Sequence, residues 1–185
     1  MFAAIILSPK KNKIPAFKSS SKLLGNSYTK ANLLVKKLAN RFKNNPDYAK
    51  MYSEFIKEYE KLNHMQPLTA NRSALPEAYY LPHHGVWRES STTTKLRVVF
   101  NGSSPTTTGY SLNDLLYTGA KLQTEIFDVL IWFRKFRYVF STDVEKMFRQ
   151  IKVHPDHWAF QRILWMNPSQ GLLTYELTTV TYGLV

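Results

Sequence analysis

The interpretation of the whole chain starts from Tyr138–Val153, which reads YVFSTDVEKMFRQIKV. Its first residues, Tyr138–Phe140, are aromatic or β-branched and predict a short strand that leads to Asp143. An aspartate at the end of a strand is a common metal ligand. An aspartate in this position also often caps the helix or turn that follows, and the spacing alone favours this second interpretation.

The positive charge of the chain is large and unevenly distributed. The 185 residues carry a formal net charge of +12. Residues 1–68 contain 13 Lys and Arg against 4 Asp and Glu, a net charge of +9, and residues 69–185 contain 12 against 9, a net charge of +3. A solvated, lysine-rich surface is the simpler explanation, but such charge also suits a polyanion, because each neutralised phosphate releases counterions. We expect nucleic acid rather than an anionic membrane as the partner.

The composition excludes several other classes of protein. Hydrophobic residues make up 44% of the chain and aromatic residues 14%, which indicates a globular protein. No apolar run approaches the ~20 residues of a membrane span. Met1–Leu7 lacks the basic residues and the length of a signal peptide. With no cysteine for disulfides, we expect an intracellular protein, cytoplasmic or nuclear, that is not secreted and has no membrane partner.

The first third of the chain is expected to be an arm followed by two helices. Residues 1–27 are rich in Lys and Ser and predict a flexible basic linker. In the region 28–68, apolar residues at helical spacing predict a helix over Thr29–Phe42. The sequence Asn45–Asp47 combines a cap, a proline and an acid, and predicts the start of a second helix that runs to about His64. We interpret both helices as structural.

A hairpin is expected in the region 69–137. Val86–Arg88 and Leu96–Phe100 read as strands joined by a polar connector. Their basic residues could clamp a phosphate, although solvated charge on an exposed strand is the favoured explanation from this feature alone. Before the hairpin, Tyr79–Leu81 predicts an edge strand. The adjacent pair His83-His84 would point to opposite sides of a strand, so we interpret it as structural or substrate-facing rather than as a metal site.

The rest of the chain predicts one helix and two further strands. Lys121–Phe136 has apolar residues at helical spacing, which we expect to face inward. Phe160–Trp165 and Leu172–Thr179 are rich in β-branched and aromatic residues and predict two strands joined by a turn. Together with the hairpin, this order predicts an α+β fold with helices on one face of a sheet.

With these segments in view, the sequence resembles the reverse transcriptases of long-terminal-repeat retrotransposons of the BEL/Pao group. The resemblance covers about residues 28–185 and includes NNPDYAKMYSEFIKEYEKLNHMQP at residues 44–67. Its other motifs are YYLPHHGVWRESSTTTKLRVVFNGS, SLNDLL, YVFSTDVEKMFRQI and YELTTVTYG. It implies a right-hand polymerase fold, in which residues 69–137 form the fingers and residues 138–185 an incomplete palm. It also implies DNA synthesis from deoxynucleoside triphosphates on an RNA or DNA template-primer, with two Mg²⁺ ions.

The resemblance assigns roles to individual residues. Asp143 lies at the position of the first metal-binding aspartate, and the backbone carbonyl of Val144 is implied to bind the same metal. Phe148 matches an aromatic steric gate, whose ring leaves room for a 2′-hydrogen on the sugar and excludes a 2′-hydroxyl. The other positions implied to contact the nucleotide are Arg88, Lys95 or Arg97, Lys146, Met147, Tyr182 and Gly183. Aligning Phe100 favours Lys95, whereas aligning the arginine before the apolar pair favours Arg97, which we prefer.

One departure from the family pattern limits the implied activity. The family's paired aspartates should follow Tyr182-Gly183, and the sequence contains no Asp-Asp pair. We therefore expect a fragment of the polymerase that is inactive alone, binds no Mg²⁺ tightly and exposes a strand edge and an apolar face. The missing portion of the polyprotein would then be a partner. A non-catalytic nucleic-acid-binding remnant and a degenerate gene fragment are the alternatives, and the sequence does not decide between them.

Overall fold

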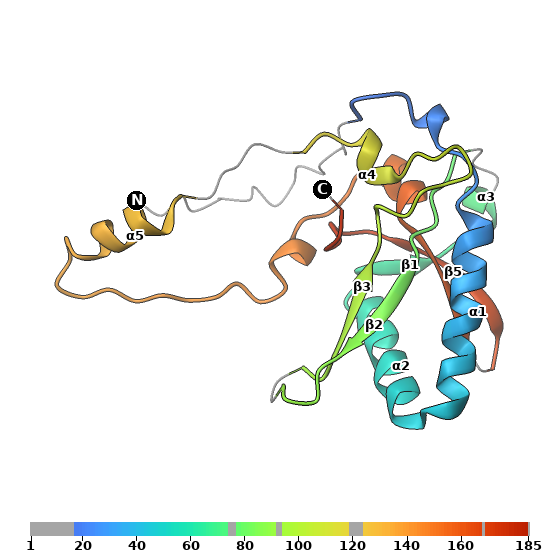
Figure 1. Ribbon diagram of the computed structural model, residues 1–185, viewed down its shortest axis with the longest axis horizontal. Coiled ribbons are helices and arrows are strands. Elements are labelled where there is room, and N and C mark those ends of the chain that lie inside the picture. The colour runs from blue at the N-terminus through green and yellow to red at the C-terminus, as the bar shows by residue number, and fades with distance from the viewer. Residues whose placement is uncertain (1–16, 74–76, 92–93, 119–123, 168, 185) are drawn as a thin grey trace.

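The computed structural model describes residues 17–73, 77–91, 94–118, 124–167 and 169–184. Most of these residues form a body of helices packed against small antiparallel sheets, so the predicted α+β class is confirmed (Figure 1). One helix and the segment after it lie apart from this body. No helix within the described ranges is long and apolar enough to cross a membrane.

Two helices form the N-terminal part of the body, as the sequence predicts. Helix α1 spans Tyr28–Asn44 and helix α2 spans Pro46–Lys61. Asn45 separates them and caps α2, because its Oδ1 accepts a hydrogen bond from the backbone N–H of Tyr48 at 3.1 Å. Both helices bury one face. Ala31 and Val35 of α1 pack against Leu164, and the tyrosines of α2 enter the main core.

A three-stranded antiparallel sheet lies beside these helices, in the order β1-β5-β4. The strands are β1 (Met65–Pro67), β4 (Arg162–Asn167) and β5 (Gly171–Leu177). The predicted β4–β5 hairpin is confirmed, with Arg162 opposite Glu176. Strand β4 begins two residues later than predicted, because Pro155–Gln161 forms the 3₁₀ helix η3.

The second predicted hairpin is also present. Strand β2 (His83–Trp87) pairs antiparallel with β3 (Leu96–Phe100), and His83 lies opposite Phe100. The edge strand predicted for Tyr79–Leu81 is wrong in extent: only Tyr80 forms a bridge, parallel to Arg162. The ladder does not continue past Leu81, where Pro82 has no N–H to donate.

Aromatic side chains dominate the core between α2 and the sheets. Tyr52 is fully buried and stacks on Trp165 of β4, with ring centroids 5.5 Å apart and an interplanar angle of 9°. Phe100 of β3 lies 5.9 Å from Tyr59. These contacts join both sheets to α2, so that the helix, β3 and β4 share one core.

The remaining described elements are short. They are η1 (Ser21–Leu23), α3 (Ala70–Ser73), α4 (Leu112–Leu115) and η2 (Met147–Gln150). Helix α4 begins with a capping box, in which Ser111 and Asp114 bond each other's backbone N–H groups. It follows the predicted loop and fixes that part of the chain beside β3.

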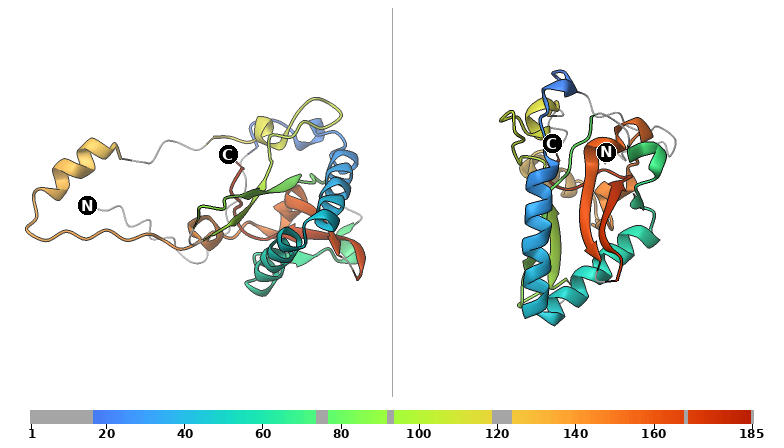
Figure 2. Two further views of the ribbon diagram at one scale, coloured as in Figure 1. Left: turned by 60° about the horizontal axis from the view of Figure 1, so that its bottom comes forward. Right: turned by 90° about the vertical axis from the view of Figure 1, so that its right-hand side faces the viewer.

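The segment from residue 124 to residue 144 differs most from the sequence prediction. Helix α5 spans only Ile126–Phe133, and residues 121–123 of the predicted helix lie outside the described residues. Its apolar side chains do not face inward: Ile126 is 70% exposed and Leu130 54%. The strand predicted for Tyr138–Phe140 is wrong, since these residues are extended without strand pairing and Phe140 is 86% exposed. Figures 1 and 2 both show this segment away from α1 and α2. None of the strands in the described ranges pairs with it.

Candidate functional site

Two aromatic residues that the sequence assigns to nucleotide binding lie against each other. The rings of Phe148, in η2, and Tyr182, beyond β5, meet edge to face with their centroids 5.7 Å apart. Phe148 is 42% exposed and Tyr182 69% exposed. A pair of this kind offers an accessible apolar surface on which a base or sugar could lie.

Backbone hydrogen bonds hold the Phe148 segment beside the Tyr182 segment. The N–H of Val153 donates to the carbonyl of Thr178 at 2.9 Å, and the N–H of Val180 donates to that of Ile151 at 2.9 Å. The chain that follows η2 therefore runs antiparallel to the chain that follows β5. This pairing, rather than the aromatic contact alone, brings the two motifs together.

Gly183 fixes Tyr182 to the β2–β3 hairpin. Its φ is +103°, and a Cβ at this position would come within 2.1 Å of the Phe100 carbonyl oxygen. The side-chain amide of Asn113 donates to the Gly183 carbonyl at 3.1 Å. Only glycine allows so close an approach in this conformation. The SLNDLL and TYG motifs therefore meet at the end of β3.

Lys146 and Arg149 attach the Phe148 turn to α2. Lys146 has a left-handed backbone, with φ of 53°, and its Nζ lies 2.6 Å from Glu58 Oε1. Its hydrogen bond to Glu58 is the largest influence on its pKa, which is raised. Arg149 lies over the ring of Tyr59, 4.1 Å from the centroid. Met147, between Lys146 and Phe148, is 48% exposed.

Asp143 and Val144 lie in the extended segment, in an exposed position. The N–H of Val144 donates to Asp143 Oδ1 at 2.9 Å. The interpretation of Asp143 as a helix cap is wrong, because η2 begins only at Met147 and Lys146 precedes it at the cap position. In the part of the chain that the structure describes, no three His, Asp or Glu side chains gather to bind a metal. Asp143 alone does not meet the octahedral oxygen coordination of Mg²⁺.

The basic residues of the hairpin share one face. The backbone N–H of Arg88 donates to the carbonyl of Lys95 at 2.8 Å and extends the β2–β3 ladder by one pair. Lys95 directly precedes β3 and pairs with Arg88 in this extension, and Arg97 lies two residues further along in β3. The three side chains therefore leave the same side of the hairpin. All three residues are exposed. Within the described ranges, no ion pair or cation–π contact joins them to Phe148 or Tyr182.

The histidine pair separates as its strand position predicts. His84 is exposed, and His83 is buried between Tyr52 and Leu164. His83 Nε2 donates to the Leu164 carbonyl at 2.7 Å, which leaves Nδ1 to accept from the Tyr52 hydroxyl. Burial lowers the pKa of His83 to about 4. This neutral, doubly hydrogen-bonded imidazole is a core residue and does not bind a substrate.

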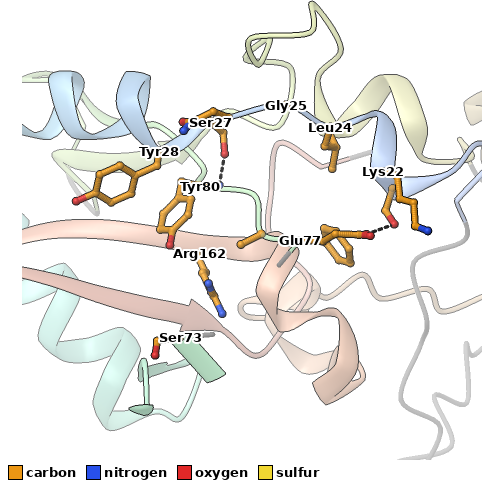
Figure 3. A pocket seen from close by; sticks show the side chains of 13 residues that line it. Lys22, Leu24, Gly25, Ser27, Tyr28, Ser73, Glu77, Tyr80 and Arg162 are labelled. Carbon is orange, nitrogen blue, oxygen red and sulfur yellow. Dashed lines mark hydrogen bonds between the residues drawn. The ribbon is translucent and has the colours of Figure 1, made fainter. Parts of the chain in front are cut away.

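A cavity of about 560 Å³ lies elsewhere in the body and was not found from the sequence (Figure 3). Buried Arg162 forms part of its wall, and the Ser27 hydroxyl accepts from the N–H of Tyr80 at 2.9 Å beside it. Its walls come from residues 21–28, from Ser73, from residues 77–80 and from residues 160–162, which no local motif connects. None of its lining residues is a predicted site residue.

The wall of this cavity is held by a buried charge network. Glu176 is fully buried, with Oε1 3.2 Å from Arg162 Nε and Oε2 2.6 Å from Arg72 Nε. Arg72 also donates to the carbonyl of Pro155 at 2.7 Å. Every donor in these contacts is satisfied by an oxygen, so the network joins α3, β4 and β5.

No protein-family model matches the chain. A search of curated proteins likewise found none that matches it.

Proposed function

We propose that the chain forms the fingers and part of the palm of an RNA-directed DNA polymerase of the BEL/Pao type. The observation that carries the proposal is the contact between Phe148 and Tyr182. These residues lie far apart in the sequence, and the resemblance assigns both to the pocket of the incoming nucleotide. Their contact supports the proposal, because a shared nucleotide pocket requires the two positions to lie together.

In the proposed site, the residues act by binding and by exclusion. Phe148 lies under the sugar, where its ring would clash with a 2′-hydroxyl. Tyr182 supports that ring, and Gly183 allows Tyr182 to approach the end of β3. Arg88, Lys95 and Arg97 supply positive charge on the face of the hairpin for phosphate groups.

We do not propose that this chain by itself carries out the two-metal chemistry of the family. Among the described residues, Asp143 belongs to no group of three or more acidic or histidine side chains that could hold a metal ion. Two Mg²⁺ ions need several carboxylate oxygens held a few ångströms apart. We therefore propose nucleotide and template binding for this chain, and catalysis only for an assembly that supplies the missing acids.

Binding of dATP and ATP tests the aromatic pocket. We expect the chain to bind dATP more tightly than ATP, by about threefold to tenfold. The Phe148→Ala variant should lose this preference, because the ring that excludes the 2′-hydroxyl is removed. Phe136→Ala is the matched control, since Phe136 is an exposed aromatic residue, 50% accessible, outside the pocket. Equal affinity for the two nucleotides in the unmodified chain would contradict the proposal.

Non-catalytic binding of nucleic acid is the second candidate function. It is supported by the net charge of +12, most of it in residues 1–68. It predicts affinity for single-stranded RNA and DNA that falls linearly with salt on logarithmic axes and does not depend on sequence. Filter-binding measurements at several salt concentrations test it, and absence of binding at low salt would exclude it.

A further inference from the structure

Two basic side chains from the Phe148 turn share one carboxylate of α2. Lys146 Nζ lies 2.6 Å from Glu58 Oε1, and Arg149 Nη1 lies 3.9 Å from the same oxygen. Lys146 also lies 3.3 Å from Glu145, whose side chain is 86% exposed. A lysine and an arginine that converge on one oxygen have the arrangement that binds an oxyanion.

The contact with Glu58 is unequal. The oxygen is within hydrogen-bonding distance of Lys146 but too far from Arg149 for a hydrogen bond. Glu58 Oε1 hydrogen-bonds Lys146 but does not hydrogen-bond Arg149 at the same time. A phosphate group is larger, carries more charge and offers three oxygens, so it could contact both side chains at once.

Arg149 is held more firmly than Glu58, whereas the Lys146 ammonium pairs with Glu58 and Glu145. Arg149 lies over two rings, 4.1 Å from the Tyr59 centroid and 5.7 Å from that of Phe55. Side-chain exposure rises from 22% for Arg149 to 32% for Lys146 and 45% for Glu58. Since ion pairs at half-exposed positions are weak, Glu58 can turn into solvent while Arg149 stays over the two rings and Lys146 keeps Glu145 beside it.

The surroundings of the pair are dominated by positive charge. The pKa of His64 is lowered, first by burial and then by the charges of Arg149 and Lys146, and Glu58 opposes them less. Lys146 also keeps a left-handed backbone without being a glycine. Such conformations occur often at ligand sites, where the surrounding structure maintains them.

We propose that Lys146 and Arg149 form a binding site for a phosphate group, and that Glu58 occupies this site as an internal competitor. The inference rests on the proposed function for the source of the phosphate, which would be a nucleotide. The site lies on the turn that carries Phe148, so a bound phosphate would be next to the Phe148–Tyr182 pair. Phosphate binding would release Glu58 and break the ion pair that joins Lys146 in this turn to α2.

Titration with inorganic tripolyphosphate tests the site without a base or sugar. At low ionic strength, calorimetry should show that Glu58→Gln binds tripolyphosphate about threefold to tenfold more tightly than the unmodified chain. Glu54→Gln is the matched control. It removes the same charge one turn earlier on α2, where Glu54 is exposed and forms no ion pair with another described residue. This control should change the affinity by less than about twofold.

Two further variants establish which cations bind. In the Glu58→Gln background, Lys146→Met and Arg149→Met should each remove the gain in affinity, with thermal melting used to confirm that the protein stays folded. An equal gain in Glu54→Gln and Glu58→Gln would overturn the proposal, because it would show a general effect of charge. A loss of affinity in Glu58→Gln would also overturn it, because Glu58 would then hold the cations in position. Tripolyphosphate cannot report on Phe148, so failure of the dATP preference would leave this result unaffected.

Discussion

Helices α2 and α5 are both rich in large apolar side chains, but most of those of α2 are buried and most of those of α5 are exposed. In α2, Tyr48, Tyr52 and Tyr59 are buried against both sheets. In α5, Ile126 and Phe127 are 70% and 68% exposed. The difference shows that apolar residues at helical spacing predict an apolar helix face. They do not predict whether another element covers that face. Helix α2 has β3 and β4 within reach, whereas α5 lies away from them in Figure 1.

The sharpest test of this comparison removes one ring from each helix. Tyr52→Ala should lower the free energy of unfolding by about 3–5 kcal/mol, because it opens a cavity and leaves the Nδ1 atom of His83 without its hydrogen-bond partner. Phe127→Ala should change it by less than about 0.5 kcal/mol, since the ring is already in water. Urea denaturation followed by circular dichroism measures both. A large loss in Phe127→Ala would mean that a partner covers α5 in solution.

Lowering the pH should reduce the free energy of unfolding, because His83 is buried in its neutral form. The pKa of this buried imidazole is lowered from 6.5 to about 4. Unfolded chains therefore take up the proton first, and stability present above pH 6.5 is lost as the pH falls toward 4. We expect about 2 kcal/mol of loss between pH 6.5 and 5 from this group.

The control for the acid effect is His83→Gln, measured across the same pH range. Its dependence on pH should be shallower, although His64 and His157, whose pKa values are also lowered by burial, remain in the variant. A slope equal to that of the unmodified chain would show that His83 does not cause the acid sensitivity of the body.

A more modest loss of stability is expected from a change where the candidate site joins the body. Gly183→Ala should destabilise the protein by about 1–2 kcal/mol, because the new Cβ would meet the Phe100 carbonyl and φ is positive. Gly109→Ala separates the two causes, since φ there is +86° and nothing lies within 4 Å of the added atom. Thermal melting should show a smaller loss for Gly109→Ala. Equal losses would mean that backbone strain alone accounts for the effect.

Local patterns predicted much of the body. The cap at Asn45 and the spacing in α1 and α2 predicted both helices, and the two hairpins followed from β-branched runs separated by polar turns. The failures lie at Tyr79–Leu81, at α5 and at Tyr138–Phe140. In each case the sequence had the right residue types, but a strand or a buried face also requires a neighbour that distant parts of the chain must provide.

The amino-acid sequence was enough to predict most of the local elements and the positive charge, and the resemblance supplied the candidate site residues. Which of those residues lie together depends on the tertiary structure. Phe148 reaches Tyr182 because backbone pairing around Val153 brings the segments together. Asp143 stays exposed, and it belongs to no group of three or more possible metal ligands among the described residues. The contact of Glu58 with Lys146 could not be foreseen either, because it joins a helix to a turn far along the chain. Hydrogen bonds and apolar periodicity within a segment are local, whereas contacts between segments depend on how the whole chain closes its core.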